Sequence, residues 1–269
     1  SMKQAGVRVH LNTEVKKVLK NDTGFTLQLA DGTKDTADKV MVATGGISYE
    51  STGSTGDGYR FAEEFGLKVT ECCPSLVPFN VREDWVKELQ GLSLKNVSIL
   101  IKDGKKKLFS DFGEMMFTHF GVTGPLILTA SSVCARKIRE KEVKLYLDLK
   151  PALTKEQLDA RILREFDANA NKQFRNVLPS FLPSKLVGVM YELCGIAPEK
   201  RIHDITREER ERFLSCMKEL ELTVTGLRGY NEAIITKGGV SVKEIDPSTM
   251  ESKTVPGLYF IGEVLDLDA

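Results

Sequence analysis

One short segment restricts the possible folds of this chain more than any other. Val40-Met-Val-Ala-Thr44 is a continuous apolar run, and Gly45 and Gly46 follow it directly. Such a run is typical of a strand that is buried on both faces of a parallel sheet. The glycines let the backbone approach a ligand at the carboxyl edge of the sheet, where open α/β sheets bind their ligands. Taken alone, the segment also fits any parallel strand that ends in a glycine turn.

A second strand of the same kind lies near the end of the chain, in Val255-Pro-Gly-Leu-Tyr-Phe-Ile-Gly-Glu263. The strand expected over residues 257–262 again ends in glycine, and Glu263 follows it as an acceptor for hydroxyl hydrogen bonds. An edge strand with a solvated Glu263 is the alternative. If both strands lie in one parallel sheet, their carboxyl ends meet at one edge. The fold class predicted from this pattern is α/β, with α+β inserts between the two strands.

The patterning divides the chain into a sheet domain and two inserted pieces. Residues 1–70 and 225–269 contain the short strands of the sheet domain. Residues 71–150 are expected to form a β-rich insert. Residues 151–224 are expected to form a helical subdomain, because strand-like alternation gives way there to capped helices.

Local signals predict individual elements within these pieces. Thr154…Gln157 and Thr206…Glu209 each fit a capping box at the start of a helix, and Pro125 suits the first position of another helix. Asp103-Gly104 predicts a hairpin turn. Further expected elements are strands at Val7–Leu11, Thr13–Leu19, Phe25–Leu29 and Val240–Ile245, and a helix from about Tyr59 to Phe65.

Charge and cysteine content narrow the possible partners. Lys plus Arg and Asp plus Glu both total 38, so the chain has no electrostatic footprint for nucleic acid or an anionic membrane surface. No apolar run reaches the length of a membrane span. The five cysteines lack CxxC spacing, which predicts neither a metal site nor disulfides and favours a cytoplasmic location. Cys72 and Cys73 are either a redox pair or two small apolar residues at a strand end.

Six motifs follow one another along the chain. They are Ala43-Thr-Gly-Gly-Ile-Ser-Tyr49, Gly53-Ser-Thr-Gly-Asp-Gly-Tyr59, Pro74-Ser-Leu-Val-Pro78, the run from Gly113 to Pro125, Thr236-Lys-Gly-Gly-Val240 and Gly262-Glu-Val-Leu-Asp266. In this succession the chain resembles the YhiN/BaiN-type NAD(FAD)-utilising dehydrogenase family, also called aminoacetone-oxidase-like flavoproteins. The resemblance covers nearly the whole chain. It implies a Rossmann-like FAD/NAD(P)-binding sheet domain that carries a β-barrel-like insert and a helical subdomain.

The resemblance also implies FAD-binding roles for residues of the sheet domain. Glu263 would bind the ribityl chain, and the main chain of Val15 would meet the adenine edge. The glycine pair 238–239 would approach the flavin ring, whereas the segment 44–46 would lie near the cofactor. The complete set of implied FAD-binding residues is Val15, Thr44, Gly45, Gly46, Gly238, Gly239, Gly262, Glu263 and Asp266.

The function that the resemblance implies is that of an FAD-dependent oxidoreductase. It would transfer hydride between flavin and either a nicotinamide or an organic small-molecule substrate, with NAD(P)H as a possible electron donor. Enone reduction and amine oxidation are both represented in the family. The family's N-terminal Gly-x-Gly-x-x-Gly fingerprint and C-terminal Gly-Gly-Tyr-Asn stretch have no counterpart here, so we expect a truncated FAD-binding domain, absent or weak FAD binding and an inactive fragment. A non-catalytic binding or regulatory module is the alternative.

His119 is the candidate catalytic residue. It stands between two phenylalanines, just before Gly-Val-Thr-Gly-Pro125. Close to a flavin it could donate a proton to a substrate that receives hydride; the alternative is a structural histidine that caps a loop. The loop Gly53–Gly58 also has two interpretations. It is either a phosphate-binding glycine loop or a loop in which Asp57 is the N-cap of the next helix.

Overall fold

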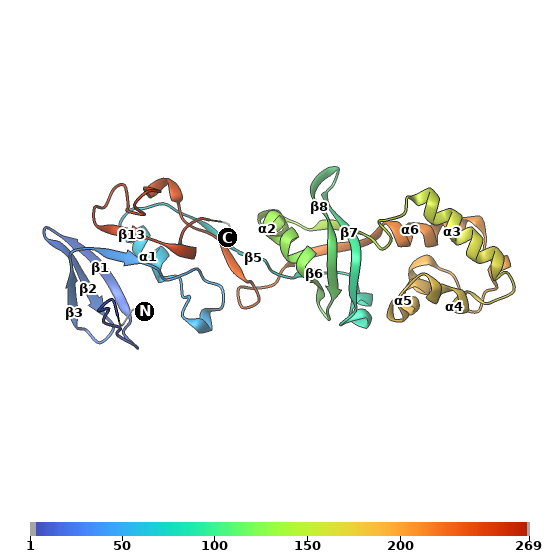
Figure 1. Cartoon of the computed structure of the whole chain (residues 1–269), viewed down its shortest axis with the longest axis horizontal. Coiled ribbons are helices and arrows are strands. Elements are labelled where there is room, and N and C mark those ends of the chain that lie inside the picture. Colours follow the sequence, from blue (N-terminus) through green and yellow to red (C-terminus); the bar gives the residue numbers. More distant parts are fainter. Residues whose placement is uncertain (1–3, 268–269) are drawn as a thin grey trace. The chain divides into compact units, whose positions relative to one another are not determined.

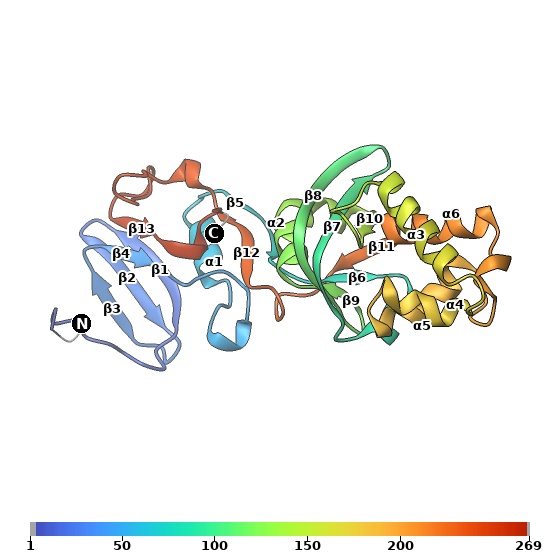
Figure 2. The same ribbon diagram turned by 45° about the vertical axis from the view of Figure 1, so that its right-hand side comes forward.

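The chain divides into two compact units in the computed structural model, which describes residues 4–267 (Figures 1 and 2). Two separate segments of the described chain, residues 4–72 and 235–267, form the first unit. Residues 73–234 form the second unit, which is therefore an insert between the two halves of the first. The insert includes residues 225–234, which the sequence patterning assigns to the sheet domain.

An antiparallel sheet of three strands opens the first unit. The strands are β1 (Val15–Asn21), β2 (Gly24–Leu29) and β3 (Lys34–Ala37). The strand predicted over residues 7–11 is wrong: no strand is assigned to this segment, and its side chains at Val9 and Leu11 are 59% and 79% exposed. Alternating apolar residues without a neighbouring strand bury no surface, so their pattern alone does not stabilise a strand.

Two short parallel strands carry the glycine-ended segments, β4 (Val40–Val42) and β13 (Leu258–Phe260). They pair in register, and Val42 lies opposite Phe260. The prediction that both strands lie in one sheet is confirmed, while a wider Rossmann-like sheet stays a prediction. Burial on both faces is wrong for β4, since Val42 is 4% exposed and Met41 is 60% exposed. Successive side chains of a strand point to opposite faces, and within residues 4–267 the Met41 face of β4 is left open.

The first unit also contains the α-helix α1 and the strand that returns from the insert. α1 (Asp57–Glu64) buries Phe61 and Ala62. Strand β12 (Ile235–Val240) pairs with β5 (Val69–Ser75), which leads into the second unit. The strand predicted over residues 240–245 is wrong. Ser241 Oγ accepts a hydrogen bond from the Lys243 N–H at 3.4 Å, and the chain turns there into a short 3₁₀ helix.

A closed barrel of six strands forms one part of the second unit, with the order β10-β11-β6-β9-β8-β7. The strands are β6 (Phe79–Val81), β7 (Ser93–Asp103), β8 (Lys106–Phe117), β9 (Gly121–Thr123), β10 (Val143–Asp148) and β11 (Leu220–Leu227). The predicted hairpin between β7 and β8 is confirmed, with Gly104 in the left-handed region at φ +57°. α2 (Pro125–Glu140) begins with proline at the first position, as predicted. β11 closes the barrel between β10 and β6, although it follows the helices in the sequence.

Four helices lie between β10 and β11 in the chain. They are α3 (Lys155–Ala168), α4 (Phe174–Val177), α5 (Ser184–Cys194) and α6 (Arg207–Lys218). Both predicted capping boxes are confirmed. Thr154 Oγ1 accepts from the Gln157 N–H at 3.2 Å, and Gln157 Oε1 accepts from the Thr154 N–H at 2.9 Å. The corresponding bonds between Thr206 and Glu209 measure 3.3 and 2.8 Å.

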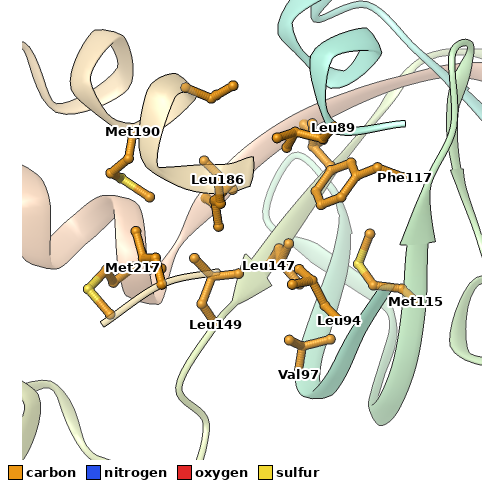
Figure 3. Close-up of a cluster of buried hydrophobic side chains, with 14 of the residues drawn as sticks. Leu89, Leu94, Val97, Met115, Phe117, Leu147, Leu149, Leu186, Met190 and Met217 are labelled. Carbon is orange, nitrogen blue, oxygen red and sulfur yellow. The ribbon is translucent and has the colours of Figure 1, made fainter. Parts of the chain in front are cut away.

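The barrel and the helices share one apolar core (Figure 3). Met115 and Phe117 enter it from β8 and Leu147 from β10, while Met190 and Met217 enter it from α5 and α6. All five side chains are 0% exposed. Because they bury apolar surface against one another, the barrel and the helices form one compact unit. The change of sequence periodicity distinguishes the barrel strands from the helices, but it does not predict that both pack around the same core.

The capping boxes lead to a first prediction. Replacing Thr154 or Thr206 by alanine should each lower the free energy of unfolding by about 1 kcal/mol, because a backbone donor at the helix N-terminus loses its acceptor. Thr129→Ala, within α2, is the matched control: alanine favours the helix interior, so the free energy of unfolding should stay level or rise. Urea unfolding followed by far-UV circular dichroism measures the three values. Equal losses in all three variants would contradict the capping role.

Candidate functional site

The parallel pairing of β4 and β13 brings two predicted segments to one edge of the sheet. The backbone continues from β4 into Thr44-Gly45-Gly46 and from β13 into Gly262-Glu263. The Ile261 N–H donates to the Val42 carbonyl at 3.1 Å, so the strands stay together up to their last residues. These segments, residues 44–46 and 262–263, are here called the strand-end edge. The sequence-based prediction that they meet is confirmed.

Thr236 holds the strand-end edge together, and sequence reasoning missed it. Its Oγ1 accepts hydrogen bonds from the N–H groups of Ile47 and Ser48 at 2.9 and 3.1 Å. Its own N–H donates to Glu263 Oε1 at 2.7 Å. One buried threonine from β12 therefore connects the loop after β4 to the carboxylate after β13. Its position at the start of the motif Thr236-Lys-Gly-Gly-Val240 is the only sequence signal for it, and it does not identify these partners.

The predicted glycines serve two different purposes. A Cβ atom at Gly46 would lie 2.4 Å from Thr236 Oγ1, at Gly238 2.4 Å from the Glu71 carbonyl oxygen, and at Gly239 2.6 Å from that of Val264. These three glycines let the chain pack against itself. Gly262, in contrast, is exposed at φ +76°, and a Cβ there would meet no atom within 4 Å. Of these four glycines, Gly262 is the one at which close packing within the described chain does not require glycine.

Thr44 presents a polar atom that the described part of the chain does not satisfy. Its Oγ1 is buried, and no hydrogen-bond partner for it lies within residues 4–267. A Cβ atom at Gly58 would lie 2.3 Å from this hydroxyl oxygen, so the Thr44 side chain lies against the first turn of α1. A buried hydroxyl without a partner costs about 1–3 kcal/mol, and such groups concentrate at functional sites.

The loop before α1 has a different N-cap residue from the one that the sequence predicts. Gly56, at φ +80°, is the N-cap of α1, and Asp57 is the first residue of the helix. The Asp57 carboxylate accepts from Thr55 Oγ1 at 2.6 Å and from the Arg60 guanidinium at 2.8 Å. The Thr55 hydrogen bond, followed by that from Arg60, lowers the pKa of Asp57. Asp57 as N-cap is therefore wrong by one residue, because glycine alone adopts the left-handed conformation there without strain.

Two further predicted FAD-binding residues lie outside the strand-end edge: Asp266 follows it in the chain, and Val15 lies in β1. Asp266 follows Glu263 by one short turn, and its N–H donates to the Val240 carbonyl at 2.8 Å. Val15 lies in β1 opposite Leu29 and is half-buried against the apolar core of the first unit. The structure thus joins Asp266 to β12, whereas contact of Val15 with an adenine stays a prediction.

His119 lies in the turn between β8 and β9, in the second unit. Thr118 closes this turn: its Oγ1 accepts from the Gly121 N–H at 3.1 Å, and its N–H donates to the Gly121 carbonyl at 2.8 Å. The His119 side chain is exposed, its ring lies 5.0 Å from that of Phe120, and within residues 4–267 no hydrogen bond to its imidazole is found. A loop-capping role therefore belongs to Thr118. The strand-end edge is in the other unit, so proton donation by His119 stays a prediction.

The remaining features of the described residues concern metal-ligand clusters, membrane-spanning helices and the environment of the adjacent cysteines. Within residues 4–267, no group of three or more His, Cys, Asp or Glu side chains could hold a metal ion. In the same range, no helix is long and apolar enough to cross a membrane. Cys73 is fully buried in β5, and Cys72 beside it is half-buried.

Two family models match this chain. Residues 73–235 match the family described as HI0933-like protein barrel and H2TH domain, and residues 1–46 match flavin-containing amine oxidoreductases. With the strand-end edge, these matches support a flavin-dependent oxidoreductase as the general class. The chain belongs to the HI0933-like family, whose match covers its barrel and helices. The predicted flavoprotein resemblance is confirmed at this level.

Curated relatives extend the similarity to nearly the whole chain. The ribosomal RNA dihydrouridine synthase of Escherichia coli K12 is 33% identical over 264 residues, and that of Haemophilus influenzae is 34% identical over 268 residues. These alignments cover 98% and 97% of this chain and 63% of each relative. The 3-dehydro-bile acid delta(4,6)-reductase of Clostridium scindens is 28% identical over 269 residues, which are 99% of this chain and 65% of that protein. The chain thus spans somewhat less than two thirds of the length of these relatives.

Proposed function

We propose that the protein containing this chain is an FAD-dependent oxidoreductase that reduces a carbon–carbon double bond conjugated to a carbonyl group. The observation that carries the proposal is the strand-end edge, where two parallel strands end in glycine beside the Glu263 carboxylate. The names of the relatives support this reaction, since a dihydrouridine synthase and a delta(4,6)-reductase both add hydrogen to ring double bonds. The match to amine oxidoreductases ends at Gly46, so it supports the nucleotide-binding strands rather than amine chemistry.

The residues at the strand-end edge fit FAD. The open backbone at Gly262 would admit the cofactor, and the half-buried Glu263 carboxylate would accept hydrogen bonds from the ribityl hydroxyls. The Thr236 N–H holds this carboxylate in place, which fixes its direction before a ligand binds. Reduced FAD supplies a hydride when it is bound, and NAD(P)H is the proposed source of that hydride.

The substrate that we favour is a uracil base in RNA. In uracil the C5=C6 bond is conjugated with the C4 carbonyl, so the hydride is added at C6 and a proton at C5. His119 is the proposed donor of that proton, because its exposed imidazole is free of hydrogen bonds within residues 4–267. A small cyclic enone is the second candidate, which the name of the Clostridium scindens relative favours.

The distribution of charge supports RNA more than the net charge of zero suggests. Residues 73–234 contain 26 Lys and Arg against 22 Asp and Glu, whereas the rest of the chain contains 12 against 16. The overall neutrality is therefore the sum of a net positive barrel–helix unit and a net negative sheet unit. The expectation that the substrate is a small molecule and not a nucleic acid was based only on the net charge of the whole chain, which does not show this difference between the units.

The experiment uses the complete reading frame that contains this sequence. We expect it to purify yellow with FAD and, with NADPH or NADH, to add two hydrogen atoms to uridine in ribosomal RNA, detected by mass spectrometry of the nucleosides. Glu263→Gln should weaken FAD binding about tenfold, because a neutral amide oxygen accepts hydroxyl hydrogen bonds less strongly than a carboxylate. Glu63→Gln, on the exposed surface of α1, is the matched control and should bind FAD normally. A colourless protein, or equal affinity in both variants, would contradict the proposal.

A further inference from the structure

We propose that the second unit carries a cationic groove for the phosphodiester backbone of RNA, formed by Lys95, Lys150, Arg161 and Arg164. The choice of RNA as the ligand depends on the proposed function, whereas the groove itself is a property of the described side chains. The cations come from β7, from the segment after β10 and from α3, so only the tertiary structure brings them together.

Two clefts contain these residues. Ser93, Lys95 and Lys150 line one of about 280 Å³, together with apolar side chains that include Leu149, Leu182 and Pro183. Gln157, Arg161 and Arg164 line another of about 580 Å³, together with Leu153, Ala160 and Glu165. The polar lining can bind phosphate oxygens, and the apolar lining can contact ribose or bases.

Lys150 belongs to the first cleft and Arg161 to the second, and the segment at Phe181 lies next to both. Burial lowers the pKa of the Lys150 ammonium, and the positive charge of Arg161 nearby lowers it further. The Arg161 guanidinium in turn lies over the Phe181 ring at 5.7 Å. Phe181 directly precedes Leu182 and Pro183, which line the first cleft, so Arg161 of the second cleft lies against the segment that forms the first.

The groove cations lack the carboxylate partners that other cations of the unit have. Within the described residues, no ion pair engages Lys95, Lys150, Arg161 or Arg164, and Glu165 is the only carboxylate that lines the two clefts. On the same helix α3, Asp159 pairs with Arg210 at 3.0 Å, and elsewhere in the unit Lys200 pairs with Glu209 at 2.8 Å. Since the chain neutralises these other cations and leaves the groove positive, the groove is suited to an external anion.

The arrangement of the four cations indicates a chain of phosphates rather than one phosphate. Lys95 and Arg164 are exposed, and Lys150 and Arg161 are half-buried, so the charges follow a surface and do not converge on a buried point. An extended polyanion can place one phosphate near each of these cations, and each such contact adds to its binding affinity. The other lysine-rich segment, Lys105–Lys107, is exposed at the end of the β7–β8 turn and the start of β8, and it serves as a comparison.

The test measures binding of this chain to a fluorescein-labelled single-stranded oligouridine RNA by fluorescence anisotropy, without flavin. Lys95→Ala/Arg164→Ala should weaken binding about tenfold at low salt, because two phosphate contacts are lost. It should also reduce the slope of log K against log salt by about 1.4. Lys106→Ala/Lys107→Ala removes the same charge and should weaken binding less than about threefold. Both pairs are exposed, so the thermal unfolding temperature should not change in either variant.

Three results would overturn the proposal: no RNA binding by the unmodified chain, equal weakening by the two double variants, or equally tight binding of labelled polyglutamate. The outcome is separable from that of the proposed function. Groove-dependent RNA binding by a protein that fails to reduce uridine would contradict only the reductase proposal. Normal uridine reduction by the Lys95→Ala/Arg164→Ala protein would contradict only the groove.

Discussion

In the FAD-loaded, complete protein, His119→Ala is expected to slow the oxidation of reduced flavin by substrate about 10²- to 10⁴-fold. The removed imidazole would no longer donate the proton that accompanies hydride transfer. Reduction of the flavin by the nicotinamide should keep its rate, because that step does not need this proton. Stopped-flow absorbance of the two half-reactions measures each rate separately.

Thr118→Ala is the matched control for His119, since it changes the neighbouring residue of the same turn. It removes the acceptor of the Gly121 N–H and should lower the free energy of unfolding by about 1 kcal/mol, with both half-reactions unchanged. His119→Ala should alter that free energy by less than about 0.5 kcal/mol, because the side chain is exposed. An oxidative half-reaction at the unmodified rate in the His119→Ala protein would remove His119 from the mechanism.

Gly121→Ala is expected to destabilise the barrel by about 3 kcal/mol or more. Gly121 lies at φ +156°, and a Cβ there would sit 2.2 Å from the Phe79 carbonyl oxygen and 2.9 Å from the Val81 nitrogen. These are backbone atoms of β6, which pairs with β9 at this point, so the two strands would have to separate. Urea unfolding of the second unit, monitored by circular dichroism, measures the loss.

Gly104→Ala separates the effect of the close contact from that of the backbone conformation. Gly104 also has a positive φ, +57°, but a Cβ there would meet nothing within 4 Å. This variant should lose only about 1 kcal/mol, the typical cost of placing alanine in the left-handed region. If Gly121→Ala cost no more than Gly104→Ala, close packing of β9 on β6 would not be the reason for glycine at position 121.

Part of the candidate site was predictable because its signals are local. An apolar run ending in glycine predicts a strand and a turn within a few residues, and the segments at Thr44 and Glu263 were found in this way. Their meeting at one edge followed from the rule that parallel strands share a carboxyl edge. Thr236 was missed because its partners Ile47 and Ser48 lie 189 and 188 residues away in the sequence, and no local pattern reports such a partner.

In the fold, too, features that depend on local interactions were predictable, and features that depend on distant contacts were not. Capping boxes, the proline at the start of α2 and the hairpin at Gly104 depend on hydrogen bonds and backbone preferences within a few residues, so the sequence was enough to predict them. The closure of the barrel by β11, the single core shared by barrel and helices, and the presence of Lys95 and Lys150 in one cleft depend on the burial of side chains from distant segments. Burial is set by every neighbour at once, and only the folded chain supplies those neighbours.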